Sequence, residues 1–431
     1  MLGVLTQAGY RITQKAAEAG IIVINTCGFI EDSKKESIDQ ILDMAVHKET
    51  GVCHTLAVAG CLVQRYSQEL KKEIPEIDLF VGTNEYPQIA EYLTALNISE
   101  GGAPVHLTLP TFVHDAQTPR ILADQSSSAF LKIAEGCMKR CSFCIIPMMR
   151  GNLRSRRIPD LVMEAQQLAQ MGIKELNLVA QDLSDYGRDL KPFNPYALPD
   201  LLKNLLTVKG IEWFRLFYCY PDGITDELIH LIKTEPRICN YIDMPLQHAN
   251  DIVLKRMNRA ITKKKMVALI TKLRNEIPDI SIRTSFIVGF PGETDSQFHE
   301  LLDFITWAEL DHVGVFKYSQ EEGTPSYHLD EQIDEDVKRQ RLRVAQELLN
   351  DLAEKKAATR VGTTLKVMVE GKHPESDHLL LGRSQGQAKE IDSYIIINDG
   401  VDPDSPPLPG SFFNVTISES TGGDLIGCLH P

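Results

Sequence analysis

The sequence has no hydrophobic run long enough to cross a membrane. No apolar stretch of the 431-residue chain approaches the about 18 residues that a membrane-spanning helix needs. Its first residues, MLGVLTQAGYRITQ, also have no basic region, long apolar region and small-residue cleavage site, which excludes a secretion signal. We therefore expect a protein of the cytoplasm that has no membrane partner.

The sequence also has fewer basic than acidic residues. Lys and Arg number 45 against 59 Asp and Glu, which gives a formal net charge of −14. A protein whose main target is nucleic acid usually has a basic face, because neutralisation of phosphates dominates its affinity. The acidic balance therefore makes tRNA an unfavourable partner, although a local basic patch is compatible with it.

The length of the chain predicts two or three domains, because one hydrophobic core rarely serves so many residues. Residues 1–100 alternate between helix and strand patterns, which predicts a flavodoxin-like α/β domain. Residues 123–360 repeat a strand, loop and helix pattern that is typical of a partial βα barrel. Residues 361–431 have short β-like runs with Gly and Pro turns, which favour a small antiparallel β-barrel. We expect a linker over 97–128.

Several runs of residues define the expected elements. In the first domain, buried parallel strands are expected in GIIVINTCGF and TLAVAGC. In the second, strands are expected in FLKIAEG, ELNLVAQD, WFRLFYCYP, YIDMPLQH, ISIRTSFIVGF and HVGVFKYS. Residues 334–356 predict one long amphipathic helix with an apolar stripe of Val337, Ala345, Leu348, Leu349 and Leu352.

Polar residues follow several of these strands. In an open parallel sheet or a βα barrel, the carboxyl ends of the strands are where ligands bind. The candidates for cofactor binding are Gln181, Asp182, Gln247, Gly289 and Glu293. Hydrogen bonding at strand ends explains the polar residues about equally well, and a plain turn explains Gly289. No catalytic residue is singled out.

The segment EGCMKRCSFCIIP, residues 135–147, places Cys137, Cys141 and Cys144 in the pattern C-x3-C-x2-C. Thiols of a long cytoplasmic chain stay reduced, so metal or catalytic use outranks disulfides. A zinc site would need a fourth ligand, and the nearest downstream histidine is the distant His230. Packing of three buried thiols is disfavoured by the polar neighbours of the segment.

A 4Fe–4S cluster is the remaining interpretation of this trio. Three thiolates leave one iron without a protein ligand. Such an iron is able to chelate the amino and carboxylate groups of S-adenosylmethionine, and an electron from the cluster then releases a 5′-deoxyadenosyl radical. The trio Cys137, Cys141 and Cys144 is therefore predicted to hold iron.

At this point the sequence resembles the radical S-adenosylmethionine methylthiotransferase family. The likeness rests on EGC…CSFCIIPMMRGNLRSR, NTCGFI, GCL, VAQDLSDYG, PLQHA and RTSFIVGFPGET, and the tail resembles the TRAM barrel of the same family. The resemblance covers nearly the whole chain. It implies a transferase of sulfur-containing groups with two 4Fe–4S clusters, S-adenosylmethionine as cofactor and an electron donor such as flavodoxin or ferredoxin.

The resemblance also implies that Cys27 and Cys61 hold the second cluster, together with a third cysteine. The family pattern places that cysteine and a first strand ahead of the helix that ends in LTQAGY, and the sequence as written starts inside this helix. Either the start is misplaced, or the copy has lost its sulfur-donating site and only cleaves the cofactor. Cys53 is interpreted as a bystander rather than a replacement, and Cys219, Cys239 and Cys428 as isolated thiols.

Within the family, the sequence looks like the branch that modifies the β-carbon of an aspartate in small-subunit ribosomal protein twelve. The motifs RGNLRSR and VAQDLSDYG resemble that branch rather than the tRNA adenosine branch. Residues 361–431 have four basic and ten acidic residues, which suits a basic ribosomal protein better than tRNA. The alternatives are a tRNA adenosine methylthiotransferase, a non-enzymatic iron–sulfur scaffold and a zinc protein. A solvated basic face is expected for Arg150, Arg154, Arg156 and Arg157, and contact with carboxylates of the substrate or cofactor is the alternative.

Overall fold

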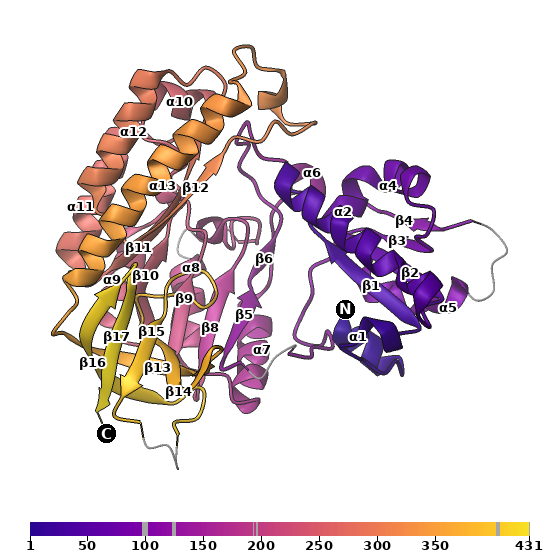
Figure 1. Cartoon of the computed structure of the whole chain (residues 1–431), viewed down its shortest axis with the longest axis horizontal. Helices are drawn as coiled ribbons and strands as arrows, with labels where there is room; N and C mark the ends of the chain where they lie inside the picture. The colour runs from indigo at the N-terminus through magenta and orange to yellow at the C-terminus, as the bar shows by residue number, and fades with distance from the viewer. Residues whose placement is uncertain (97–101, 123–125, 193, 195–196, 402–405, 431) are drawn as a thin grey trace. The chain divides into compact units, whose positions relative to one another are not determined.

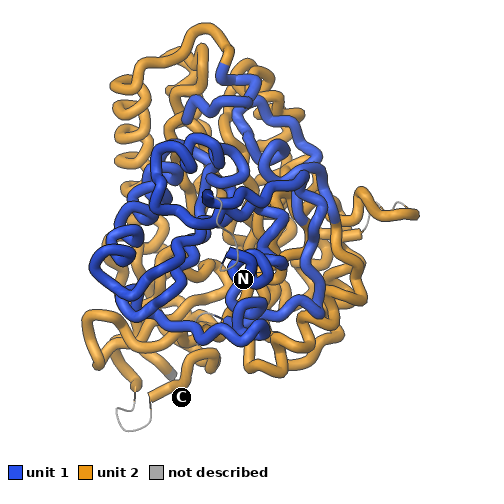
Figure 2. Tube along the Cα trace, turned by 90° about the vertical axis from the view of Figure 1, so that its right-hand side faces the viewer, with its two compact units in different colours: residues 1–123, 135–154, 319–327 blue, residues 124–134, 155–318, 328–431 orange. Residues whose placement is uncertain are grey.

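The computed structural model describes residues 1–96, 102–122, 126–192, 194, 197–401 and 406–430. Two compact units make up the chain, coloured separately in Figure 2. Unit 1 consists of residues 1–123, 135–154 and 319–327, and unit 2 of residues 124–134, 155–318 and 328–431. The predicted domain limits at 100 and 123 lie outside the described residues, and the three-domain division stays a prediction.

Unit 1 contains a parallel sheet of four strands in chain order. Its strands are β1 (Ile21–Thr26), β2 (Thr55–Gly60), β3 (Leu79–Val81) and β4 (Val105–His106). The two strands expected from β-branched runs are confirmed. The expectation of a linker is wrong at Val105 and His106, where the chain adds an edge strand to β3. Two residues are too few to show a hydrophobic period, so no pattern indicated this strand.

Helices cover both faces of this sheet, as expected for a flavodoxin-like domain. They are α1 (Leu2–Gln7), α2 (Glu31–Ala45), α3 (His47–Thr50), α4 (Cys61–Glu73) and α5 (Ile89–Leu96). Leu56 and Val58 pack with Ile41 of α2 on one face. The alternate residues Ala57 and Ala59 pack with helices α1 and α5 on the other face. The alternation of side chains along β2 thus gives the sheet two apolar faces, and each is buried under helices.

Unit 2 contains a parallel sheet of six strands in the order β12-β11-β10-β9-β8-β5 (Figure 1). The strands are β5 (Ser128–Lys132), β8 (Glu175–Val179), β9 (Trp213–Leu216), β10 (Ile238–Asp243), β11 (Ser281–Val288) and β12 (His312–Lys317). Two short strands, β6 (Ala134–Glu135) and β7 (Arg154–Ser155), pair separately. All six predicted strands are therefore confirmed, and they form an open βα array.

The connecting helices of unit 2 are α7 (Ile158–Gln170), α8 (Ala197–Leu205), α9 (Asp226–Thr234), α10 (Asp251–Arg256), α11 (Lys263–Glu276) and α12 (Asp295–Ala308). The long helix expected over 334–356 is α13 (Glu335–Ala358). Its predicted apolar stripe is wrong at Val337, which is exposed, whereas the basic residues Lys338 and Arg341 are buried. Lys338 lies over the ring of Tyr318, and Arg341 pairs with carboxylates. Contacts with an aromatic ring and with carboxylates therefore determine which face of α13 is buried at these positions.

Among the described residues, no helix has the length and apolar character of a membrane span.

The C-terminal segment forms a closed barrel of five strands in the order β13-β14-β15-β17-β16. The strands are β13 (Thr364–His373), β14 (Ser376–Arg383), β15 (Ile395–Asp399), β16 (Phe412–Thr421) and β17 (Asp424–His430). The expectation of a fully antiparallel barrel is wrong for β15 and β17, which pair in parallel. A ring with an odd number of strands cannot alternate direction all the way round, so one parallel pair is unavoidable.

Buried charges join this barrel to the six-stranded sheet. Arg383 of β14 donates to Glu175 of β8 over 2.6 Å, and Arg215 of β9 donates to the same carboxylate over 2.8 Å. The side chains of Glu175 and Arg383 are both 0% exposed. Arg383 also donates to Glu370 and to Ser128. Burial by itself would raise the pKa of Glu175, yet the two guanidinium groups hold it at about 2.

Candidate functional site

The three cysteines of the C-x3-C-x2-C pattern lie in one loop of unit 1, between Glu135 and α6 (Ile146–Arg150). The amide of Cys144 donates to the carbonyl of Cys141 over 3.1 Å, which makes a tight turn at the end of the trio. The amide of Cys137 donates to the carbonyl of Gly151 over 3.1 Å. Both ends of the loop are thus fixed by backbone hydrogen bonds.

Gly136 is needed for the loop to begin in this way. Its φ is +81°, and a Cβ there would lie 2.1 Å from the carbonyl oxygen of Asn152. Arg140 closes the loop further, because its guanidinium donates to the carbonyl of Cys137 over 3.0 Å and to the Asn152 side chain over 2.7 Å. Any other residue at 136 would push the start of the loop away from the returning chain.

The donor set of this loop fits an iron–sulfur cluster. Cys137 is buried, and Cys141 and Cys144 are half-buried. Thiolates are soft ligands that select iron–sulfur clusters or zinc. In the part of the chain that the structure describes, no three His, Cys, Asp or Glu side chains already converge as a metal site. The chemistry of the donors, and not a preformed geometry, therefore carries the assignment of Cys137, Cys141 and Cys144.

The second pair of cysteines lies at the carboxyl edge of the unit 1 sheet. Thr26 of β1 is paired with Gly60 of β2, and Cys27 and Cys61 come directly after these residues. Neighbouring strands lie roughly 4.8 Å apart, so the register brings both residues to the same edge. Cys27 is exposed and Cys61 is buried. The structure therefore brings together two of the residues that the family resemblance assigns to a second cluster.

Cys53 lies at the opposite edge of the same sheet. It precedes β2, and its thiol lies 3.4 Å from the carbonyl of Thr55, the first residue of the strand. Six residues of strand separate that edge from Cys61, a span of roughly 20 Å at about 3.3 Å per residue. Cys53 packs in the apolar core on the α2 side. This placement supports its interpretation as a bystander.

An arginine that follows the trio in the chain contacts a cysteine of the second pair inside unit 1. Arg150, the last residue of α6, donates from Nη2 to the sulfur of Cys61 over 3.1 Å. Its Nη1 lies 3.6 Å from Glu135. Ile145 and Met149, just after Cys144, pack against Cys61. No feature of the cysteine spacing indicated this contact.

The expectation of a solvated basic face is wrong for two of its four arginines. Arg150 is directed at Cys61, as described. Arg156 is buried and pairs with Asp160 over 2.7 Å and with Glu164 over 2.5 Å. Arg157, in contrast, is exposed. The run of arginines is therefore divided between internal contacts and solvent, because successive residues of the chain point in different directions.

Gln181 and Asp182 follow β8 in unit 2, as predicted. One carboxylate oxygen of Asp182 accepts hydrogen bonds from the amide and the hydroxyl of Ser184, at 3.0 and 2.6 Å. The same oxygen accepts the amide of Tyr220 over 3.4 Å. Asp182 therefore ties the end of β8 to the segment after β9, which is the strand-end alternative stated above. Cofactor binding by Gln181 and Asp182 stays a prediction.

Gln247, Gly289 and Glu293 lie at the carboxyl edges of β10 and β11. Gln247 exchanges backbone hydrogen bonds of 2.8 Å with the carbonyl of Ser285 and the amide of Ile287. Glu293 accepts the amide of Gly289 over 2.8 Å. Gly289 has φ +74°, and a Cβ there would lie 2.4 Å from the Lys338 side chain. The predicted residues of this edge therefore hold the loop after β11 in place.

Arg341 and His248 surround the carboxylate of Glu293. Arg341 donates to Glu293 over 3.1 Å, and the Nε2 atom of His248 lies 3.7 Å from it. Burial raises the pKa of Glu293 to about 7, against the opposing effect of Arg341. Burial also lowers the pKa of His248 to about 3, so the imidazole is neutral. The sequence showed His248 only as a polar strand-end residue, and no pattern indicated Arg341.

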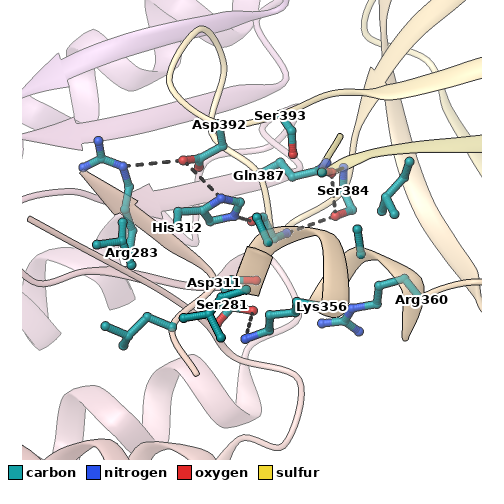
Figure 3. A pocket seen from close by; sticks show the side chains of 18 of the residues that line it. Ser281, Arg283, Asp311, His312, Lys356, Arg360, Ser384, Gln387, Asp392 and Ser393 are labelled. Atoms are coloured by element: carbon teal, nitrogen blue, oxygen red, sulfur yellow. Dashed lines mark hydrogen bonds and ion pairs between the residues drawn. The ribbon is translucent and has the colours of Figure 1, made fainter. Parts of the chain in front are cut away.

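Unit 2 also has a cavity of about 710 Å³ between its sheet, α13 and the barrel (Figure 3). Asp392 of the barrel is the central carboxylate of its wall. It lies 3.5 Å from Arg283 and 3.4 Å from His312, and it accepts the hydroxyl of Tyr241 over 2.8 Å. These groups satisfy one another, so we interpret the cavity as part of the joint between sheet and barrel.

Comparisons with known proteins agree with this architecture. The model of the radical SAM superfamily matches residues 131–305, which include the cysteine trio. The model of the uncharacterised family UPF0004 matches residues 1–82, with Cys27 and Cys61, and that of the TRAM domain matches residues 361–429. The superfamily match indicates an iron–sulfur cluster and S-adenosylmethionine as cofactors.

Solved structures show the same fold at low sequence identity. The radical S-adenosylmethionine methyltransferase TsrM from Kitasatospora setae, with cobalamin and a [4Fe–4S] cluster bound, aligns with a TM-score of 0.52 and 14% identity. The alignment covers 75% of this chain and 65% of that one.

Curated relatives match over nearly the whole length. The ribosomal protein uS12 methylthiotransferase RimO of Pelobacter propionicus is 46% identical over 99% of this chain and 93% of its own. The protein of the same name from Geobacter sulfurreducens is 45% identical over 99% of this chain and 94% of its own. The chain therefore belongs to the radical S-adenosylmethionine methylthiotransferase family, with the proteins named RimO.

Proposed function

We propose that this chain transfers a methylthio group to the β-carbon of an aspartate in ribosomal protein uS12. The observation that carries the proposal is the likeness to uS12 methylthiotransferases over 99% of the chain, with the cysteine trio inside the matched region. No described feature of the chain favours another chemistry as strongly.

In this proposal Cys137, Cys141 and Cys144 hold a 4Fe–4S cluster. When bound, the cluster and S-adenosylmethionine supply the 5′-deoxyadenosyl radical that opens the C–H bond of the substrate. The chain contributes the geometry. Gly136 and Arg140 fix the loop, and three thiolates leave one coordination position for the cofactor rather than for a fourth side chain.

Residues after the strands of unit 2 would orient S-adenosylmethionine. Asp182 and Glu293 are buried and bonded to backbone amides, so they set the shape of their loops. Gln181 and Gln247 lie beside them in the chain and are able to offer both donors and acceptors to the cofactor. Gly289 lets the backbone approach closely.

A second cluster on Cys27 and Cys61 would supply the sulfur. The shared edge of β1 and β2 and the contact of Cys61 with Arg150 support this role. The described residues offer two thiols at this edge, one fewer than the trio in the loop. A second candidate function, in which the chain cleaves S-adenosylmethionine without completing sulfur insertion, rests on the cysteine trio alone.

The proposed substrate guides the choice of the remaining partners. A basic ribosomal protein suits the excess of acidic residues over 361–431, and a ribosomal substrate is consistent with an enzyme of the cytoplasm. A small reductant such as flavodoxin or ferredoxin would deliver the electrons. The rival substrate is a tRNA adenosine, which the acidic barrel disfavours.

Expression of the chain in a bacterium that lacks its own uS12 methylthiotransferase tests the proposal. We expect intact-mass spectrometry to show a methylthio group on uS12, and the Cys141→Ala variant to leave uS12 unmodified. Methylthio-adenosine in the tRNA with unmodified uS12 would establish the rival. Production of 5′-deoxyadenosine by the purified protein, with neither product formed, would establish the second candidate.

A further inference from the structure

Tyr218, just after β9, has an unusual backbone conformation and an exposed ring. Its φ is +57°, in the left-handed region that bulky residues rarely adopt. The side chain is 44% exposed, although the adjacent Phe217 and Cys219 are buried. No other tyrosine in the described part of the chain is as exposed. The end of this strand therefore directs one aromatic side chain out of the core.

Hydrogen bonds hold Tyr218 in this conformation. Its amide donates to a carboxylate oxygen of Asp243 over 3.2 Å, and its carbonyl accepts the amide of Leu183 over 2.9 Å. The next amide, that of Cys219, donates to the carbonyl of Asp243 over 2.8 Å. The buried Asp243 also accepts from Arg283 over 3.2 Å. The ends of the neighbouring strands β8 and β10 thus fix the backbone of Tyr218 from both sides.

The strained backbone lies where a ligand could make use of it. Strain of this kind lowers stability, persists only where the surroundings impose it and is concentrated at functional sites. The neighbouring strand β10 is followed by a second such residue, Gln247 with φ +72°, which is a predicted cofactor residue. Both residues belong to the carboxyl edge of the sheet, where βα arrays bind their ligands.

The side chain of Tyr218 offers a partner two kinds of contact. Its ring continues an aromatic row, because the ring centroid of Phe217 lies 6.0 Å from that of Tyr218 and 6.5 Å from that of Phe130 in β5. Phe130 is itself 51% exposed. Among the described residues, none makes a hydrogen bond with the hydroxyl of Tyr218. The hydroxyl is therefore available both as a donor and as an acceptor.

The exposure of Tyr218 favours a polypeptide over a small molecule as its partner. Small-molecule sites are concave and enclose most of their ligand. The candidate cofactor residues Asp182 and Glu293 agree with this, since each is 3% exposed. Tyrosine is enriched where proteins meet, because it combines an apolar ring with a polar tip. An exposed tyrosine on a fixed backbone therefore suits a protein substrate.

We propose that Tyr218 is a substrate-contact residue, which packs its ring against the segment of uS12 that carries the aspartate and donates its hydroxyl to an oxygen of that segment. This inference rests on the proposed function, because the partner is the proposed substrate. A purely structural role of the ring predicts instead that Tyr218→Phe binds uS12 as the parent does, since the ring and its contact with Phe217 remain.

The test measures affinity for uS12 rather than turnover. The full chain is purified anaerobically and reconstituted with iron and sulfide. Binding of labelled uS12 is followed by fluorescence anisotropy at about 0.15 M salt, which screens long-range attraction between an acidic and a basic protein. Tyr218→Phe removes the hydroxyl, and Tyr218→Ala removes the ring as well. Trp307→Ala is the matched control, because Trp307 is 46% exposed near the end of α12, the helix that leads to the amino edge of the sheet.

We expect Tyr218→Phe to bind uS12 about fivefold more weakly, which is the effect of one net hydrogen bond. Tyr218→Ala should bind about thirtyfold more weakly, as at an interface hot spot. Trp307→Ala should match the parent, and all variants should bind S-adenosylmethionine as the parent does. Loss of S-adenosylmethionine binding with unchanged affinity for uS12 would assign the ring to the cofactor and overturn the inference.

Urea unfolding tests the backbone conformation on which the inference depends. Tyr218→Gly and Tyr218→Ala both lack the ring, and they differ in how well they tolerate a positive φ. We expect Tyr218→Gly to unfold at the higher urea concentration, which reverses the usual order of the two residues. If Tyr218→Ala is the more stable variant, the backbone at this position is not left-handed and the inference is overturned.

Failure of the inference and failure of the proposed function give different results. A parent protein that neither binds nor modifies uS12 would overturn the proposed function, and this inference with it. If the parent binds uS12, and Tyr218→Phe and Tyr218→Ala bind it as tightly, the inference alone is overturned.

Discussion

Two arginine contacts, one in each unit, show how differently the same side chain is used. In unit 2, Arg383 lies against Glu175 with both side chains fully buried, and Arg215, Glu370 and Ser128 complete the network. In unit 1, the side chain of Arg150 is 28% exposed and meets Cys61 through one hydrogen bond. The first contact lies among several charged and polar partners inside the fold, whereas the second faces a sulfur that is itself able to bind metal.

The difference follows from what each contact must do. Buried charges are tolerated only when they are paired and hydrogen-bonded, so the Glu175 network fixes one arrangement of barrel and sheet. A thiolate site must instead stay open to its ligand, which limits how many protein groups surround it. We therefore expect changes in unit 2 to act on stability, and changes in unit 1 to act on iron and cofactor chemistry.

Loss of a trio cysteine should have the largest effect. We expect Cys141→Ala to abolish formation of 5′-deoxyadenosine, because two thiolates do not replace three in holding the cluster. Anaerobic reconstitution, reduction and chromatography of the products measure this. Cys428→Ala, an isolated half-buried thiol of the barrel, is the control and should retain the activity. Undiminished cleavage in Cys141→Ala would remove the trio from the mechanism.

The second prediction concerns the buried Glu175 network, which connects the barrel to the six-stranded sheet in unit 2. Glu175→Gln should lower the free energy of unfolding by about 3–5 kcal/mol, because it leaves Arg215 buried without a carboxylate and Arg383 with Glu370 as its remaining carboxylate partner. Urea unfolding, followed by circular dichroism, measures the change. The exposed pair of Lys203 and Glu227 offers a control, since Lys203→Gln there should have no measurable effect. If Glu175→Gln and Lys203→Gln have equal free energies of unfolding, the buried network is no more important for stability than the exposed pair, which would contradict this expectation.

The third prediction is the pH dependence of the stability that Glu175 contributes. The pKa of Glu175 is about 2 in the folded protein and has an ordinary value of 4.5. Between these values the unfolded chain binds the proton more readily, so stability falls as the pH is lowered. The full contribution is present above about 4.5 and is lost toward pH 2. Unfolding midpoints of the native protein and Glu175→Gln should therefore converge over this range, and parallel curves would exclude Glu175 as the cause.

The smallest effect is expected at Cys53. Cys53→Ala removes a buried sulfur at the edge far from Cys61 and should cost about 1 kcal/mol of stability. Iron content after reconstitution should be unchanged, whereas Cys61→Ala should reduce it. If Cys53→Ala loses as much iron as Cys61→Ala, the separation of the two edges has no bearing on the cluster.

Much of the architecture was predictable because the signals are local. The β-branched runs before Cys27 and Cys61 defined β1 and β2, and the repeated runs after residue 123 defined the six strands of unit 2. Prediction failed for the strand β4, because its two residues are too few to show the hydrophobic period of a strand. It also failed on α13, because Lys338 and Arg341 face inward to partners from distant parts of the chain.

The candidate site divides in the same way. Spacing alone selected Cys137, Cys141 and Cys144, since three thiols within eight positions have few other uses. Strand ends and the family resemblance selected Cys27 and Cys61. Neither spacing nor resemblance indicated Arg150, because its partner is 89 residues away in the sequence.

By itself, the sequence determined the type of each domain and the family, and it selected the candidate thiol ligands, because these depend on local hydrophobic periods and short motifs. Only the tertiary structure decided which charged groups are paired, where the barrel meets the sheet and which cation faces the sulfur of Cys61. Such contacts join residues far apart in the chain, and a pattern read along the sequence contains no distance between them.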